Sequence, residues 1–383
     1  MRHHLYNPDF DFVKAPEEFD KYTERAFLQY CLGATLYMPG TKDILNKILN
    51  KSLSDITSIV MCFEDAIQES DLPQAEDNVK YHLNKIADAI EKSELEVDEI
   101  PLIFLRIRDI NHFRNFADEL TTREINVLTG FVFPKFYSSN ATQYLQLLDS
   151  LCAKHDAVLY GMPILEGKTI AYQETRKDEL LFLKKILDPY KERLLNIRVG
   201  GTDFSALFGV RRGINYSIYD ILTIRDCLSD ILNFFNRAEE DYLVSAPVWE
   251  YFLAYKEDNI FNLLDDDFHK SILNRLPILN DAIDGLLREV ILDKANGFVG
   301  KTIIHPSHAR FVNALQVVNR EEYEDAIQIL ETSGGVIKST TENKMNEINP
   351  HKSWAKKVVN RARAYGVIEN DTSYVQLISN LKE

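Results

Sequence analysis

The sequence predicts an α/β protein, and specifically a closed (β/α)₈ barrel. Short apolar, β-rich runs alternate along the chain with longer amphipathic segments, which is the pattern of parallel strands joined by crossover helices. Eight such runs can be counted, and eight is the number that closes a barrel of the TIM type. The 383 residues, of which 45% are hydrophobic and 27% charged, are enough for one large barrel in a folded protein.

Each expected strand is a short apolar run that ends at polar or turn-forming residues. In chain order the runs are 33–39, 59–63, 102–107, 130–134, 157–163, 195–199, 242–247 and 301–304. The longer segments between them have helical periodicity, most clearly in 143–154, 174–187 and 219–238. In the last of these, Ile224, Leu228 and Ile231 recur every three or four residues and predict a buried helix face.

Three regions are expected along the chain. Residues 1–32 form an N-terminal segment, 33–320 the barrel, and 321–383 a C-terminal extension. Within the barrel, the acidic stretch 259–293 predicts helices inserted before the last strand.

The extension begins with a region rich in Ser, Thr, Gly and Asn at 332–349, which predicts a loop. A basic helix is expected at 352–365. Its lysines and arginines suit a phosphate-bearing ligand, a solvated face or an acidic neighbouring subunit. Because the extension is too short for a domain of its own, we expect a lid or a subunit contact.

Composition excludes several classes of function. A net charge of −15 argues against a general nucleic-acid-binding surface, which needs a basic face. No apolar run is long enough to span a membrane, and the first residues lack the apolar core of a secretory signal. The four cysteines are widely spaced and form no Cys-x-x-Cys pair, as expected for reduced, buried residues of a cytoplasmic protein.

Two acids stand directly after two neighbouring strands of the expected barrel. Glu166 follows the fifth strand, and Asp203 follows the sixth after Gly200 and Gly201. Strand ends of a barrel meet at one rim, where two carboxylates can hold a hard cation such as Mg²⁺, with Mn²⁺ as an alternative. The competing interpretation is that each acid caps the helix that follows it. Glycines beside Asp203 favour the ligand site, because their backbone N–H groups can approach a bound anion closely.

Further candidates lie at the ends of other strands. Glu64 follows the second strand, where it is expected to orient a water or a neighbouring side chain. Arg106 ends the third strand, and its guanidinium suits a substrate carboxylate or carbonyl oxygen. For Lys135 and Lys301, an ion pair at the rim or floor of the barrel is favoured over a Schiff base.

Taken together, these motifs resemble those of the HpcH/HpaI aldolase and citrate lyase beta-subunit superfamily over residues 36–315. The matching segments are Met38-Pro39-Gly40, Phe63-Glu64-Asp65-Ala66, Leu105-Arg106-Ile107, Phe133-Pro134-Lys135, Ile164-Leu165-Glu166, Gly201-Thr202-Asp203-Phe204 and 297–306. The tail looks like that of a branch described as a carbon–carbon bond lyase of the TIM-barrel fold, associated with bacterial tellurium-resistance and stress gene clusters.

The resemblance implies a lyase or aldolase that stabilises an enolate with Mg²⁺. It implies metal ligation by Glu166 and Asp203 and substrate binding by Arg106. We further expect that backbone N–H groups at Gly201 and Thr202 bind substrate and that Arg106 and Glu64 have catalytic roles. The expected substrate is a small carboxylate or an acyl thioester, and relatives suggest a homotrimer or homohexamer. The alternative is a barrel in a stress-response system that binds a metabolite or nucleotide without turnover.

Overall fold

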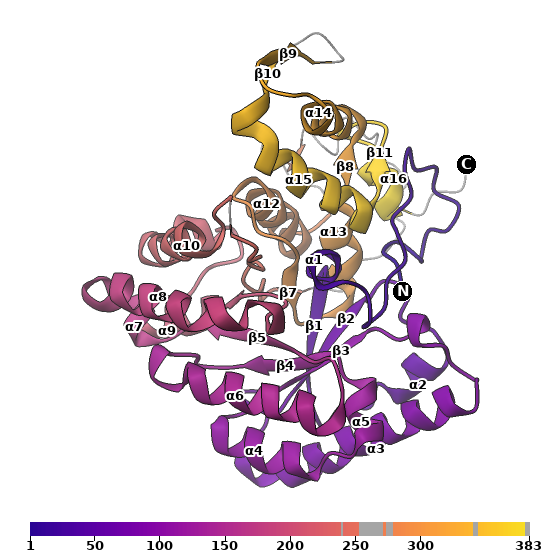
Figure 1. The fold of residues 1–383 in the computed structure, drawn as a ribbon, viewed down its shortest axis with the longest axis vertical. Helices are drawn as coiled ribbons and strands as arrows, with labels where there is room; N and C mark the ends of the chain where they lie inside the picture. The colour runs from indigo at the N-terminus through magenta and orange to yellow at the C-terminus, as the bar shows by residue number, and fades with distance from the viewer. Residues whose placement is uncertain (239, 253–270, 273–278, 340–343, 380–383) are drawn as a thin grey trace.

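Seven parallel strands form one curled sheet among the residues that the computed structural model describes, which are 1–238, 240–252, 271–272, 279–339 and 344–379. The strands pair in the order β6-β5-β4-β3-β2-β1-β7 (Figure 1). Their bounds are β1 Ala34–Pro39, β2 Ser58–Cys62, β3 Leu102–Arg106, β4 Gly130–Phe133, β5 Tyr160–Leu165, β6 Arg198–Val199 and β7 Lys301–Ile303.

Residues 242–247 close the gap between β6 and β7. Val244 forms a parallel bridge with Ile197, and Ala246 forms one with Lys301. The N–H of Ser245 donates to the carbonyl of Ile197 at 2.9 Å, so this segment is hydrogen-bonded on the β6 side as well. The predicted (β/α)₈ barrel is therefore confirmed. Its seventh strand, expected at 242–247, is present only as isolated bridges.

Helices cover the outside of the barrel and connect successive strands (Figure 1). Their bounds are α1 Arg25–Leu28, α2 Leu45–Leu49, α3 Leu72–Glu91, α4 Ile110–Glu119, α5 Thr122–Val127, α6 Ser138–His155, α7 Lys168–Ala171, α8 Gln173–Leu187, α9 Gly201–Leu207, α10 Leu222–Phe235, α12 Asp281–Ala295 and α13 Ala309–Ala314. The three helical segments predicted from periodicity correspond to α6, α8 and α10. Of the helical segment expected at 259–293, the part from 281 onward lies in α12, and residues 259–270 and 273–278 lie outside the described residues.

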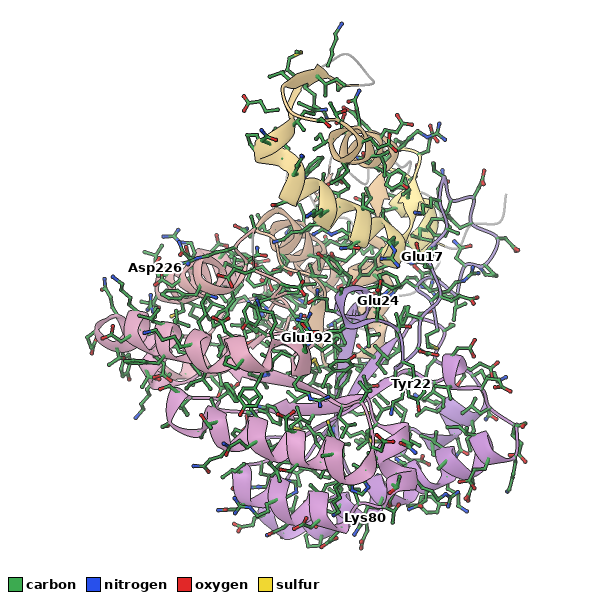
Figure 2. The ribbon with its side chains drawn as sticks, in the orientation of Figure 1. Glu17, Tyr22, Glu24, Lys80, Glu192 and Asp226 are labelled. Carbon is green, nitrogen blue, oxygen red and sulfur yellow. The ribbon has the colours of Figure 1, made fainter. Side chains whose placement is uncertain are left out.

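The strands are buried on both faces, which explains why they appear in the sequence as continuous apolar runs. In β3, Ile103, Phe104 and Leu105 have no exposed surface. One face of such a strand packs inside the barrel and the other packs under the helices. Charged side chains lie on the outer helix surfaces, as Lys80 and Asp226 do in Figure 2. No described helix is both long and apolar enough to cross a membrane.

The C-terminal extension forms a small helical layer with its own apolar cluster. Its elements are β8 Val318–Asn319, α14 Arg320–Glu331, β9 Val336–Lys338, β10 Met345–Glu347, α15 Ile348–Tyr365, β11 Val367–Ile368 and α16 Tyr374–Ser379. The basic helix predicted at 352–365 is confirmed within α15. The loop predicted at 332–349 is wrong in part, because β9 and β10 pair there as antiparallel strands. Three-residue strands of mixed polarity give no alternating pattern to detect.

The N-terminal segment holds this extension in place. The N–H of Val367 donates to the carbonyl of Lys14 at 2.8 Å, adding a strand-like contact beside β11. Glu17 and Glu24, both labelled in Figure 2, form ion pairs with Arg363 of α15 at 3.0 and 3.6 Å. Residues from the two ends of the chain are thus packed together. Whether the extension also serves as a lid or subunit contact stays a prediction.

Candidate active site

A cavity of about 390 Å³ lies at the end of the barrel where the strands finish. Its walls come from the carboxyl ends of β1, β2, β3, β5 and β6 and from residues near β7. This is the end of a (β/α)₈ barrel on which active sites are found. The lining residues are Tyr37, Met38, Pro39, Cys62, Asp65, Ala66, Arg106, Ile164, Glu166, Arg198, Val199, Gly200, Gly201, Thr202, Asp203, Val248, Thr302 and Ile304. Within the described part of the C-terminal extension, no residue lines this cavity.

Glu166 and Asp203 face the same cavity. Glu166 directly follows β5, and Asp203 lies in the first turn of α9, just after β6, which pairs with β5. Glu166 is only 3% exposed. Burial raises its pKa to about 8, and although the charge of Arg106 opposes this shift, the charge of Asp203 adds to it. A buried carboxylate beside a second acid provides a site whose negative charge a cation would compensate.

Neither of these acids caps the helix that follows it. The N-cap residues of α7 and α9 are Gly167 and Gly200, and no side chain caps either helix. Instead, Oε1 of Glu166 accepts a 2.7 Å hydrogen bond from the backbone N–H of Lys135. The carboxylate of Asp203 makes no hydrogen bond or ion pair with any other residue that the structure describes. Side-chain capping therefore does not explain these residues, while Asp203 does lie in the first turn of α9, where an acid is favoured.

Arg106 links the acids at the ends of β2 and β5. Its Nη2 lies 2.7 Å from Oε2 of Glu64 and 3.5 Å from Oε1 of Glu166. Burial by itself lowers the pKa of Arg106, but Glu166, Cys62 and Glu64 together raise it, so the guanidinium stays charged. The Nε–H of Arg106 is buried without a hydrogen-bond partner.

Glu64 and Lys135 do not line the cavity, but each contacts a residue that does. The ammonium of Lys135 pairs with the Glu64 oxygen opposite the one that binds Arg106. Burial raises the pKa of Glu64, which Arg106 and Lys135 counteract. Lys135 itself has a φ of +47°, in the left-handed region, and its N–H donates to Glu166. The ion pair expected for this lysine is confirmed.

The second lysine, Lys301, also forms the expected ion pairs, with two acids of α12. Its Nζ lies 2.9 Å from Oε1 of Glu289 and 2.8 Å from Oδ2 of Asp293, both on α12. All three side chains are at most 1% exposed. This network belongs to the packing between α12 and the barrel and does not line the cavity.

Gly200, which precedes Asp203, lies too close to the side chain of Glu166 to carry a side chain of its own. A Cβ at Gly200 would lie 2.4 Å from both Cβ and Oε2 of Glu166, well inside contact distance. Gly201 and Thr202 line the cavity at the start of α9, where backbone N–H groups have no partner within the helix. Their predicted contact with substrate stays a prediction.

Arg198 was not identified from the sequence as a site residue. It lies in β6, lines the cavity and is 1% exposed. The signal was present in the run Ile197-Arg198-Val199, because a charged residue inside an apolar strand requires a reason. Tyr37 and Thr302, which also line the cavity next to Arg198, were missed because nothing in sequence separates them from ordinary strand residues.

The donor set fits a divalent metal that needs few protein ligands. Within the described residues there is no group of three or more His, Cys, Asp or Glu side chains placed to hold an ion. Mg²⁺ is commonly bound through one or two carboxylates, with water and substrate oxygens filling the remaining positions. Glu166 and Asp203 match that requirement, whereas a closed structural zinc site would need four ligands.

The family of the chain follows from its sequence profile. Residues 26–367 match the family of C–C bond lyases of the TIM-barrel fold. The chain belongs to this family. The match spans the barrel and most of the C-terminal extension, so the protein is a carbon–carbon lyase built on the fold described above. A comparison with curated proteins finds no match.

The solved structures that this lyase resembles have low sequence identity to it. CitE from Mycobacterium tuberculosis, in complex with magnesium, acetoacetate and coenzyme A, is 16% identical, with a TM-score of 0.53 over 87% of this chain and 99% of that one. RipC from Yersinia pestis is 15% identical, with a TM-score of 0.46 over 74% of this chain and 94% of that one. The CitE likeness supports the fold of the lyase.

Proposed function

We propose that this lyase depends on Mg²⁺ and cleaves or forms a carbon–carbon bond next to a carbonyl group. The substrate is a small carboxylate or an acyl thioester, and Mn²⁺ can replace Mg²⁺. The observation that carries the proposal is that Glu166 and Asp203 line one cavity, with Glu166 buried and Asp203 free of other partners among the described residues. CitE, which shares the fold, was solved with magnesium, acetoacetate and coenzyme A, which is compatible with this chemistry.

Glu166 and Asp203 hold the ion through their carboxylates. When bound, Mg²⁺ acts as a Lewis acid that stabilises the negative charge developing on an enolate oxygen. The hydrogen bond from the Lys135 N–H fixes Oε1 of Glu166 and leaves Oε2 available. Burial raises the pKa of Glu166 to about 8, so a bound ion would compete with a proton for this carboxylate.

Arg106 contacts the reacting end of the substrate. Its Nη2 is occupied by Glu64 and Glu166, and its Nε–H has no partner among the described residues. The side chain lines the cavity and is 11% exposed. It therefore donates a hydrogen bond to the carbonyl oxygen. Glu64 holds the guanidinium in that position and in turn is held by Lys135. We therefore assign Glu64 a positioning role, with Gly201 and Thr202 supplying backbone donors at the rim.

The proposal is tested by measuring ion binding in Glu166→Gln and Asp203→Asn. Mn²⁺ binding is followed by electron paramagnetic resonance, and Mg²⁺ binding by competition. The amide of Glu166→Gln can still accept the Lys135 hydrogen bond, so the variant is expected to fold and to lose about 100-fold or more in ion affinity. Asp203→Asn is expected to show a similar loss. Turnover is then screened with Mg²⁺ against 2-oxo acids, 3-hydroxyacyl thioesters and hydroxy acids.

Glu179→Gln is the matched control. Glu179 is also buried and also accepts a backbone hydrogen bond, 2.7 Å from the N–H of Ser138, but it does not line the cavity. This variant should bind Mn²⁺ as the unmodified protein does. Undiminished Mn²⁺ binding in both Glu166→Gln and Asp203→Asn would refute the metal site. Tight ligand binding without product across the whole panel would instead favour a sensor.

A further inference from the structure

A buried arginine without a carboxylate partner lies in the floor of the cavity. Arg198 is 1% exposed, and it forms no ion pair with any acid in the described part of the chain. By contrast, Arg212, which is equally buried, pairs with both Glu250 and Glu289. Burial lowers the pKa of Arg198, and no carboxylate charge opposes the shift. An isolated buried charge is strongly disfavoured, so its presence needs an explanation.

The protein supplies Arg198 with only neutral oxygen partners. Its Nη1 donates to Oγ1 of Thr35 at 3.3 Å, and its Nη2 donates to Oγ1 of Thr302 at 2.7 Å. Thr35 on β1 and Thr302 on β7 are register partners, so the side chain of Arg198 extends from β6 to the β1–β7 pair. Two of the five N–H groups are thereby satisfied, and the Nε–H is buried without an acceptor.

A second unused donor stands next to this guanidinium. The ring of Tyr37 lies 5.3 Å from the Cζ atom of Arg198, and the Tyr37 hydroxyl is buried with no acceptor for its proton among the described residues. Both residues line the same cavity. Buried donors in native proteins almost always have partners, so unused donors on two neighbouring side chains point to an absent acceptor.

The other cations near the cavity are already neutralised. Arg106 contacts Glu64 and Glu166, and the ammonium of Lys135 pairs with Glu64. Among the described residues that line the cavity, Arg198 is therefore the cation whose charge remains available to a ligand. The planar guanidinium offers two parallel N–H groups, which match the two oxygens of a carboxylate. A phosphate dianion would call for more than one free cation.

We propose that Arg198, with the Tyr37 hydroxyl, forms an anion subsite that binds a carboxylate of the substrate, on the floor of the cavity beneath the Glu166 and Asp203 pair. This inference rests on the proposed function, because it takes the ligand of the cavity to be the substrate of the lyase. Arg106 then donates a hydrogen bond to the carbonyl oxygen of the substrate, and Arg198 selects substrates that carry a carboxylate. Thr35 and Thr302 hold the guanidinium in place without neutralising it.

The test uses the full-length protein and the variants Arg198→Met and Arg198→Lys. Acetate, malonate and inorganic phosphate are titrated by calorimetry, both with Mg²⁺ and with a chelator. We expect a carboxylate to bind the unmodified protein, about tenfold or more weaker binding to Arg198→Met, and an intermediate affinity for Arg198→Lys. Mn²⁺ binding, measured separately, should be the same in all three proteins.

Thermal unfolding separates a ligand-binding role from a structural one. If Arg198 serves a ligand, Arg198→Met without ligand should unfold at the same or a higher temperature, because a buried uncompensated charge has been removed. It should also lose the stabilisation that malonate gives the unmodified protein. A structural arginine would behave in the opposite way, with a lower unfolding temperature and an unchanged malonate effect.

Several results would overturn the subsite. These are equal carboxylate affinity in Arg198→Met, no carboxylate binding to the unmodified protein at about 50 mM, a limit far weaker than ordinary substrate affinities, or a clear preference for phosphate. The titrations with a chelator, together with the Mn²⁺ measurements, distinguish the anion subsite from the metal-dependent lyase. Carboxylate binding that depends on Arg198 in a protein that fails to bind Mn²⁺ would leave the subsite standing and remove the metal-dependent lyase. Mn²⁺ binding without an effect of Arg198 on carboxylates would do the reverse.

Discussion

The backbone N–H of Lys135 donates a 2.7 Å hydrogen bond to Oε1 of Glu166. The residue after β4 thereby fixes the orientation of the acid after β5. On the other side of the same carboxylate, Oε2 faces Gly200, where a Cβ would come within 2.4 Å. Glu166 is held between a donor and a glycine, which leaves its carboxylate little freedom to move.

Replacement of Gly200 by alanine should therefore weaken metal binding. The new methyl group would displace the Glu166 carboxylate, and we expect Mn²⁺ affinity to fall about tenfold or more. Gly213→Ala is the control, because the nearest atom to a Cβ there is 3.4 Å away on Tyr216, an ordinary contact distance. Calorimetric Mn²⁺ titrations of both variants give the answer. Equal affinities would mean that the carboxylate can rotate away without cost.

Lys301→Met should strongly destabilise the barrel. Removing the ammonium leaves Asp293 buried without a cation among the described residues, whereas Glu289 keeps its ion pair with Arg212. Breaking a buried ion pair in this way costs about 3–5 kcal/mol. Lys51→Met removes the ion pair with Glu99 on the surface and should cost under about 1 kcal/mol. Urea unfolding curves measure both losses. If Lys301→Met lowered the free energy of unfolding no more than Lys51→Met, the buried ion pairs of Lys301 would contribute little to stability.

Acid should destabilise the protein through its buried histidines. Burial lowers the pKa of His308 from 6.5 to about 4, and the pKa values of His4 and His112 are lowered to about 3 and 4 by the same cause. The unfolded chain takes up protons below pH 6.5, whereas the folded protein does so only near pH 4. Stability is therefore complete above pH 6.5 and is lost as the pH falls from there toward 4.

The variant His308→Leu isolates one of these contributions. Between pH 7.5 and 5.5, one such histidine accounts for about 1 kcal/mol of lost stability. The variant should lose correspondingly less than the unmodified protein over this interval, whatever its stability at pH 7.5. Denaturant unfolding at the two pH values measures the difference. Identical losses in the two proteins would show that His308 is not the titrating group.

The barrel and most of its strands could be predicted because a strand that is buried on both faces appears in the sequence as a continuous run of apolar residues. A run such as Leu102–Arg106 is apolar at nearly every position, and its carboxyl end must lie at the same rim as the other strand ends. The placement of Glu166 and Asp203 on one cavity followed from that geometry. The segment 242–247 was also found, although it forms only two bridges.

Other features depend on contacts that are remote in sequence. The role of Arg198 could not be predicted, because whether a buried cation is neutralised depends on which side chains from β1 and β7 reach it. The β9 and β10 pair was missed because each strand is three residues long and gains its stability from pairing.

By itself, the sequence determined the barrel, the two acids at its rim and the family to which the chain belongs, because local periodicity and strand ends fix where such residues lie. Only the tertiary structure decided how the charges are paired. It assigned Arg106 and Lys135 to Glu64 and placed no acid of the described residues against Arg198. The reason is physical: a charge is neutralised by whatever lies within a few ångströms in space, and that distance is set by folding rather than by order along the chain.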